Sequence, residues 1–342
     1  MVGRFPQYKL GIINFELHSY ILYYPSVRLC FIQILYIFNL EIDRSQEIEP
    51  RTMEQPLVMD GRPFIVEGNL RKAASQTNIN DDVNGAASWA NGWSPSTMPN
   101  SSFKTEIGIR WLDQAEAEHA SVASFARHTL QLISLGAPTQ LLDFSQKASE
   151  DEIEHSKISF GFASSFIGST FGPGPLNVEG SLRKMDVAEM IRSVIHEGCI
   201  EETIAAVKGR FKENAAQDTA VKNALSQIAS DETNHAQLAW DTVYWMTKTS
   251  PQHLLFAENV FHQELKHQLV KLQDDTTSLP TNTCVYPDEN ISLQKYGLLS
   301  SKDQAKSRTA AIRYIIEPSF RAEFKDSSFI SERIAKMDVA SF

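Results

Sequence analysis

Residues 150–157 read EDEIEHSK, so four acidic residues and one histidine fall within eight positions of a predicted helix. A charge run of this kind is usually a solvated helix face. The core of the stretch, however, occurs twice, because residues 151–155 are DEIEH and residues 231–235 are DETNH. With 9 histidines in 342 residues, any one glutamate has about one chance in forty of a histidine three positions on. The second Asp-Glu-x-x-His therefore favours a shared role for the two copies.

Four long segments with the 3.6-residue apolar period of an amphipathic helix contain or flank the two motifs. They cover residues 106–134, 139–167, 186–213 and 218–248. Short connections separate the first from the second and the third from the fourth, so each pair is predicted to form an antiparallel hairpin. The Gly- and Pro-rich stretch 168–181 is long enough to run the length of a bundle. The pattern predicts an all-α, ferritin-like four-helix bundle with one long crossover.

The predicted bundle occupies residues 105–250, and an irregular region precedes it. Residues 61–104 are predicted as an extended and loop segment. It begins with a short strand or extended stretch, GRPFIVEG (61–68), and residues 75–104 are rich in Asn, Ser, Gly and Pro, which indicates a long loop. Trp89 and Trp93 are predicted to anchor this segment on a neighbouring surface.

The region after the bundle, residues 251–342, is predicted as a helical appendage packed on it. Residues 252–272 and 302–325 have helical patterns, with a loop over 273–293 between them. Pro318 predicts an interruption of the last helix, because proline lacks the amide hydrogen that a helix interior needs.

The first sixty residues have no clear assignment. Residues 29–40, LCFIQILYIFNL, are an uncharged apolar run of twelve residues, which is short for a membrane span. A membrane anchor, a targeting segment and a mis-assigned start codon all remain open for residues 1–60, and any membrane contact is expected through residues 20–40 alone. No standard secretory signal is recognisable, so a soluble intracellular location is favoured.

The bulk composition excludes several classes of protein. The formal net charge is −10 and the pI is about 5.4, which argues against a nucleic-acid partner, because phosphate binding needs clustered Lys and Arg. The three cysteines, Cys30, Cys199 and Cys284, form no Cys-x-x-Cys pair. Neither a disulfide framework nor a rubredoxin-type iron site is therefore predicted.

The doubled motif is predicted to point into the bundle. Residues three apart share one helical face. Glu152 and His155 can therefore bind one metal ion together, and so can Glu232 and His235. Apolar residues such as Leu141 and Phe162 lie on the first of these stripes, and Leu225 and Ile228 lie on the second. Ionised carboxylates in such surroundings need a cation or a proton nearby.

The first and third helices are expected to add one acid each. Glu118 lies on the apolar seam of the first helix, and Glu202 lies on that of the third. Glu201 and Glu197 are the alternatives to Glu202, although Glu201 shares a more polar face with Glu197.

Two further histidines lie next to the seams. His119 and His196 could line the site, and structural histidines satisfied by other contacts are an equal alternative. The preferred ligand set comprises four carboxylates and two imidazoles, which suits a pair of iron ions, or a Mn/Fe or Mn/Mn pair.

These residues resemble the ferritin-like di-iron carboxylate proteins. The match rests on Glu118, Glu202 and the two motifs that begin at Asp151 and Asp231. In that superfamily the glutamates and the histidines of such motifs bind two metals, and the preceding aspartate often hydrogen-bonds a ligand histidine. The resemblance therefore implies metal ligation by Glu118, Glu152, His155, Glu202, Glu232 and His235. It also implies a supporting role for Asp151 and Asp231.

More narrowly, WLDQAEAEHASVASFARHTL, HEGCIEETIAA and DETNHAQLAW are similar to a group of bacterial ferritin-like domain proteins. In that group the acid at the place of Glu202 is present and that of Glu201 is not. The similarity runs from about Gly61 through the C-terminal helices, and it points to a cofactor more directly than to a reaction.

The leading expectation is an O₂-dependent oxidase or oxygenase acting on a small substrate, because a reduced carboxylate-bound iron pair binds O₂ or peroxide. The absence of Cys-x-x-Cys means that electrons would come from a separate donor. The first three bundle helices contain no tyrosine, which disfavours a tyrosyl-radical protein. Iron oxidation, storage or detoxification without an organic substrate is the second hypothesis, and a purely structural bundle is the third. A homodimer is compatible with each.

Overall fold

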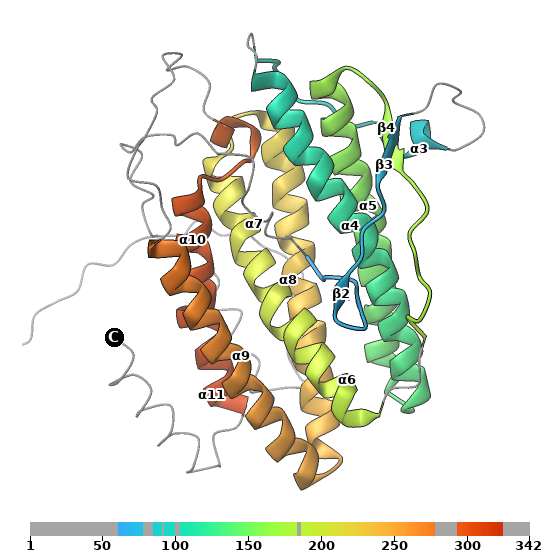
Figure 1. Ribbon diagram of the computed structural model, residues 1–342, viewed down its shortest axis with the longest axis vertical. Helices are drawn as coiled ribbons and strands as arrows, with labels where there is room; N and C mark the ends of the chain where they lie inside the picture. The colour runs from blue at the N-terminus through green and yellow to red at the C-terminus, as the bar shows by residue number, and fades with distance from the viewer. Residues whose placement is uncertain are drawn as a thin grey trace, which may run out of the picture.

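The computed structural model describes residues 61–77, 85–90, 92–99, 103–182, 186–277 and 293–323. These residues are mostly helical, as predicted. Four long helical stretches lie side by side (Figure 1). They are α4 (Phe103–Ser134), α5 (Thr139–Ile167), a third stretch made of α6 (Val187–Ser193), η2 (Val194–Glu202) and α7 (Thr203–Ala215), and α8 (Thr219–Lys248). The predicted helix boundaries therefore agree with the structure to within a few residues.

The four stretches form two helical hairpins. α4 packs along α5, and α7 with η2 packs along α8, while α5 and α8 join the two pairs. Local signals explain where the helices begin and end. Asp186 forms a capping box with Glu189, Asp218 caps α8, and Gly168 ends α5 in the left-handed region with φ of 84°.

The third stretch differs from the prediction in one respect, because residues 194–202 form a π-helix instead of a continuous α-helix. Such wide helical turns are rare in proteins, and those that occur often lie at functional sites. The segment carries Glu197, Glu201 and Glu202, and these three side chains reach three different sets of partners.

Small residues let the third stretch lie close to α8. A Cβ added at Gly198 would lie 2.4 Å from Cβ of Ala239, and one added at Gly209 would lie 3.0 Å from Cβ of Ala229. The two contacts also define the antiparallel register of the hairpin, and this register places Glu202 opposite His235.

The region before the bundle has more structure than a loop. β1 (Ile65–Val66) and β2 (Asn69–Leu70) form a short antiparallel hairpin. β3 (Ser75–Thr77) pairs with β4 (Phe171–Pro173) of the crossover, and α3 (Ala86–Ala90) follows. The prediction of a long loop from residue 75 is wrong at these elements, because the partner strand of β3 lies about a hundred residues away.

The two predicted tryptophan anchors are confirmed. The Trp89 ring lies edge-on to His119 and to Phe160, with centroid distances of 5.4 and 6.3 Å. Trp93 packs against Phe162 and directly over Gly161, where an added Cβ would lie 2.6 Å from the Cβ of Trp93. The segment before the bundle is thus fastened to α4 and α5.

The helices after the bundle cover the side formed by α7 and η2 (Figure 1). They are α9 (Pro251–Thr277), the short η3 (Leu293–Tyr296), α10 (Ser301–Ala310), η4 (Ala311–Ile316) and α11 (Glu317–Glu323). The predicted interruption at Pro318 takes the form of a π-helical turn, η4, directly before it. Part of the predicted loop 273–293 is wrong, since α9 continues to Thr277, and residues 278–292 lie outside the described residues.

Among the described residues, no helix is both long enough and apolar enough to cross a bilayer. The apolar run at 29–40 and the whole of residues 1–60 lie outside the described residues, so the alternatives for that segment stay predictions.

We predict that Gly198→Ala lowers the free energy of unfolding by about 1–2 kcal/mol, because the added methyl group overlaps Ala239 while alanine recovers up to about 1 kcal/mol of helix propensity. Urea denaturation measures the change. Gly209→Ala is the matched comparison in the same hairpin, since its added Cβ would lie 3.0 Å from Cβ of Ala229, a milder overlap, and it should destabilise the protein less. A Gly198→Ala protein as stable as the wild type would contradict the close packing.

Candidate metal centre

The six residues predicted as ligands meet in the middle of the bundle. Glu118 comes from α4, Glu152 and His155 from α5, Glu202 from η2, and Glu232 and His235 from α8. Each is at most 1% exposed. Helix geometry accounts for the convergence, because each Glu-x-x-His pair faces inward along one apolar stripe and the two hairpins bring four such stripes together.

The six side chains form two overlapping groups. The first contains Glu118, Glu152, His155 and Glu232, and the second contains Glu152, Glu202, Glu232 and His235. Within each group, one potential ligand atom from every residue lies within 4.8 Å of the others. Glu152 and Glu232 belong to both groups. Each group could hold a metal ion, and the two shared carboxylates lie where they could bridge a pair of ions.

The two imidazoles are oriented alike. Nδ1 of His155 lies 3.6 Å from both Glu152 Oε2 and Glu232 Oε1. Nδ1 of His235 lies 3.3 Å from Glu152 Oε1 and 3.4 Å from Glu232 Oε2. Both rings therefore direct Nδ1 toward the shared carboxylates and Nε2 away from them.

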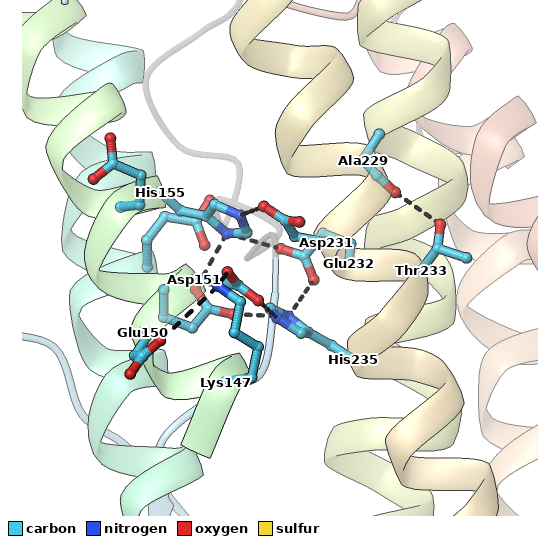
Figure 2. Close-up of polar contacts among 12 residues, drawn as sticks. Lys147, Glu150, Asp151, His155, Ala229, Asp231, Glu232, Thr233 and His235 are labelled. Carbon is cyan, nitrogen blue, oxygen red and sulfur yellow. Dashed lines mark hydrogen bonds and ion pairs between the residues drawn. The ribbon is translucent and has the colours of Figure 1, made fainter. Parts of the chain in front are cut away.

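The aspartates that precede the glutamates lie next to Nε2 of these rings, on the side away from the shared carboxylates (Figure 2). Asp231 Oδ2 lies 3.2 Å from Nε2 of His155, and Asp151 Oδ2 lies 3.6 Å from Nε2 of His235. Each aspartate thus faces the histidine of the other hairpin. A carboxylate at Nε2 favours the tautomer with a proton on Nε2, which leaves Nδ1 available as a ligand.

One further support was not apparent from the sequence. Gln114 Nε2 donates to Glu118 Oε1 at 3.1 Å, and Lys212 Nζ donates to Gln114 Oε1 at 2.9 Å. Gln114 lies one turn before Glu118, a spacing that could have indicated the contact. Lys212 comes from α7, and only the packing of the two hairpins reveals it.

The alternatives to Glu202 have other partners. Glu201 accepts hydrogen bonds from Gln268 and Arg308, and Glu197 forms a buried ion pair with Arg127, with an N–O distance of 2.9 Å. Glu202 alone of the three belongs to a potential metal-binding group among the described residues. The π-helical turn directs the three acids to these separate places.

The two neighbouring histidines also lie outside both groups. His119 is directed toward the Trp89 ring, and His196 Nδ1 lies 3.0 Å from Glu264 Oε2. Both have the structural contacts that the sequence left as an alternative to lining the site.

The chemistry of the cluster fits a metal. In the described residues, both carboxylate oxygens of Glu152, Glu202 and Glu232 are buried and have no hydrogen-bond partner. Burying ionised carboxylates in this way costs several kcal/mol each unless a cation compensates them. The carboxylate and imidazole ligands present here suit iron, manganese or zinc.

Without a metal, protons must supply that compensation. Burial raises the pKa of Glu202, and repulsion by Glu232 raises it further, to well above the ordinary value of 4.5. Burial would lower the pKa of His155, but Asp231 and Glu152 raise it well above 6.5. The pKa of His235 is raised in the same way by Asp151 and Glu152. Burial opposes ionisation of Glu152, yet the two histidines lower its pKa to about 2.

We predict that metal increases stability more as the pH rises. The raised pKa of Glu202 stabilises the metal-free fold fully below about pH 4.5, and this contribution is lost as the pH rises through the folded-state pKa of Glu202. The contribution of the two protonated histidines is complete below about pH 6.5 and is lost as the pH rises through their folded-state pKa. Bound metal displaces these protons. The melting temperatures of loaded and metal-free protein should therefore diverge between about pH 5 and pH 8, and a constant difference would contradict the assignment of these protons.

We also predict that Asp231→Asn weakens metal binding by about 10–100-fold, because His155 loses the carboxylate that orients its ring. Titration with Fe(II) or Mn(II) measures the affinity. Glu150→Gln removes an exposed charge directly before the motif of α5 and serves as the control, which should bind like the wild type. Equal affinities in both variants would show that Asp231 does not support the ligand.

Comparison with known proteins supplies no family for this chain: no family model, no curated protein and no solved structure matches it.

Proposed function

We propose that this chain is a ferritin-like di-iron carboxylate protein that uses O₂ to oxidise a small substrate. The observation that supports it most is the pair of overlapping groups that share Glu152 and Glu232. A single metal site would need only one of the two Glu-x-x-His pairs. Two groups with two common carboxylates suit two ions held side by side.

The arrangement of the helices supports the ferritin-like assignment. Each hairpin supplies one glutamate from its first helical stretch and one Asp-Glu-x-x-His motif from its second. The link between the hairpins, from Gly168 to Asp186, is the longest connection within the bundle. One crossover and inward-facing carboxylates on all four helices are the features of di-iron bundles.

Iron is the proposed metal because carboxylates and imidazoles bind it well, although manganese accepts the same ligands. When bound, a pair of reduced iron ions supplies reactivity toward O₂, which amino-acid side chains lack. The chain would hold the ions through Glu118, Glu152, His155, Glu202, Glu232 and His235. Its apolar surroundings, including Phe125, which is 0% exposed and packs against the ring of His235, would keep bulk water from the cluster.

The sequence contains no cysteine pair that could hold an electron-transfer centre for such a reaction. Cys199 is buried in the described part of the chain, and the sequence has no Cys-x-x-Cys pair. The proposed oxidase therefore takes its electrons from its substrate or from a separate protein donor.

The proposal predicts about two iron or manganese ions per chain in the purified, reconstituted protein. Glu152→Ala combined with Glu232→Ala should abolish binding, because both groups lose both shared carboxylates. Glu202→Ala should retain about one ion, since the group with Glu118 stays complete. Metal analysis of the protein after gel filtration measures all three.

Glu201→Ala is the matched control for Glu202→Ala, because Glu201 is the adjacent residue of η2 and faces Arg308 instead of the cluster. It should bind metal like the wild type. A protein that holds no transition metal would exclude the proposal. Gel filtration as a large cage, with rapid oxidation of excess Fe(II), would instead indicate the iron-storage function.

A further inference from the structure

The two potential metal-binding groups receive unequal support from the residues around them, although they share Glu152 and Glu232. In the first group, Glu118 Oε1 accepts a hydrogen bond from Gln114. Glu202 takes the corresponding place in the second group, and in the described residues neither of its oxygens accepts a hydrogen bond from outside the cluster. The glutamate that is specific to the first group is therefore held by a neighbour, and the one that is specific to the second is not.

The histidines of the two groups differ in the same direction. Asp231 Oδ2 lies 3.2 Å from Nε2 of His155 in the first group, whereas Asp151 Oδ2 lies 3.6 Å from Nε2 of His235 in the second. Asp151 also accepts a hydrogen bond from Nζ of the exposed Lys147 at 2.5 Å, so a lysine competes with the imidazole for this carboxylate. Metal affinity depends on the contacts that orient the ligands, and the first group has the closer contacts.

Lys212 determines the orientation of the Gln114 amide. Nζ of Lys212 donates to Gln114 Oε1 at 2.9 Å, and Gln114 Nε2 donates to Glu118 Oε1 at 3.1 Å. An ammonium group has donors and no acceptor, whereas an amide has one donor end and one acceptor end. Lys212 therefore holds the amide oxygen on its own side and directs the amide NH₂ group toward Glu118.

The side chains of this chain of contacts are buried. Lys212 is 6% exposed, Gln114 is 9% exposed and Glu118 is 0% exposed. A lysine is almost never buried without a partner. Lys212 lies in the last turn of α7, where a positive charge suits the helix dipole, but an exposed lysine would serve that purpose equally well. Its burial against Gln114 therefore indicates a role at the cluster.

The contact also connects the two hairpins. Gln114 lies on α4 of the first hairpin, and Lys212 lies on α7 of the second. The contacts between aspartates and histidines join α5 with α8, so the cluster is connected across both pairs of helices. Because Lys212 reaches Gln114 only when the hairpins are packed together, Glu118 takes its position as part of the folded bundle.

The hydrogen bond from Gln114 also determines which oxygen of Glu118 faces the shared carboxylates. Oε1 is engaged by Gln114, and Oε2 lies on the side of Glu232. The position of a Cβ added at Gly61 is 3.2 Å from Glu118 Oε2 and 3.6 Å from Glu232 Oε1. Glu118 is therefore already directed toward the first group, and a preorganised ligand binds more tightly because less ordering accompanies binding.

We propose that Lys212 is a positioning residue of the metal centre. Acting through Gln114, it holds Glu118 ready to bind and makes the group with Glu118 the tighter of the two metal positions. The inference rests on the proposed di-metal function and names the residues outside the ligand set that make the two positions unequal.

The test uses the full chain, freed of metal and titrated with Mn(II), whose unbound ion is counted by its electron paramagnetic resonance signal. Glu202→Ala retains the group with Glu118, and Glu118→Ala retains the group with Glu202, so each variant isolates one position. The Glu202→Ala protein should bind Mn(II) about tenfold or more tightly than the Glu118→Ala protein. Equal affinities, or the reverse order, would overturn the inference.

Lys212→Met assigns the difference to the lysine. Added to Glu202→Ala, it should weaken Mn(II) binding by about tenfold, and added to Glu118→Ala it should change the affinity by less than about twofold. Loss of a nearby positive charge would by itself strengthen the binding of a cation, so weaker binding reports the loss of positioning. Unchanged or tighter binding in the Glu202→Ala background would overturn the inference.

Further variants in the Glu202→Ala background test the route through Gln114. Gln114→Leu should cause the same loss as Lys212→Met, and the two together should cause no more than either alone, because both break one chain of contacts. Lys212→Arg keeps a buried donor and should restore most of the affinity. Additive losses, or no recovery with arginine, would show that Lys212 does not act through Gln114.

Arg210→Met is the matched control for Lys212→Met. It removes a positive charge from the same helix, but Arg210 faces Glu213, with an N–O distance of 3.0 Å. Mn(II) binding in the Glu202→Ala background should therefore stay unchanged. A loss as large as that of Lys212→Met would mean that any charge removed from α7 has this effect, and would overturn the inference.

The outcomes separate the inference from the proposed function. A wild-type protein that binds two ions, with no effect of Lys212→Met on either isolated position, would overturn the inference alone. A wild-type protein that binds no transition metal would overturn both. If Lys212→Met does not fold, the Gln114→Leu and Lys212→Arg titrations decide the matter, and an unchanged affinity in Gln114→Leu would overturn the inference.

Discussion

The burial of four carboxylates in an apolar bundle is the constraint on which the rest of this structure depends. Ionised groups in such surroundings are stable only with compensating charge, and the described protein groups supply just two histidines at the centre of the cluster. Protons on Glu202 and on the imidazoles compensate the charge in the metal-free chain, as the raised pKa values indicate. A bundle that needed only stability would carry apolar residues here, so the carboxylates mark a site that could hold a cation.

The same cluster links the two halves of the fold. Asp151 and Asp231 each face a histidine of the opposite hairpin, and Glu152 and Glu232 each approach both histidines. A metal bound there would connect α5 with α8 in addition to their packing. Metal binding should therefore stabilise the association of the two hairpins, because a site formed from both hairpins exists only in the folded chain.

Much of the fold and site could be predicted because the relevant signals are local. Helix periodicity locates α4, α5 and α8, and the i, i+3 spacing places Glu152 with His155 and Glu232 with His235 on shared faces. The apolar seam also distinguishes Glu202 from Glu201, although it assumes an α-helix where η2 is a π-helix. Non-local features were missed: the pairing of β3 with β4 and the reach of Lys212 to Gln114 depend on how distant segments pack.

Arg62 shows why such features escape prediction. In sequence it stands in a short extended stretch, more than fifty residues before the first ligand, where an arginine is ordinarily exposed. Tertiary contacts explain its burial, among them the hydrogen bonds from Ser121 and Arg127 to the backbone of its segment. A pocket of about 440 Å³ is bordered by Arg127 and Glu197, the pair that also neighbours Arg62. Arg62 neighbours this pair without bordering the pocket, so its burial depends on tertiary contacts that no pattern in residues 61–68 encodes.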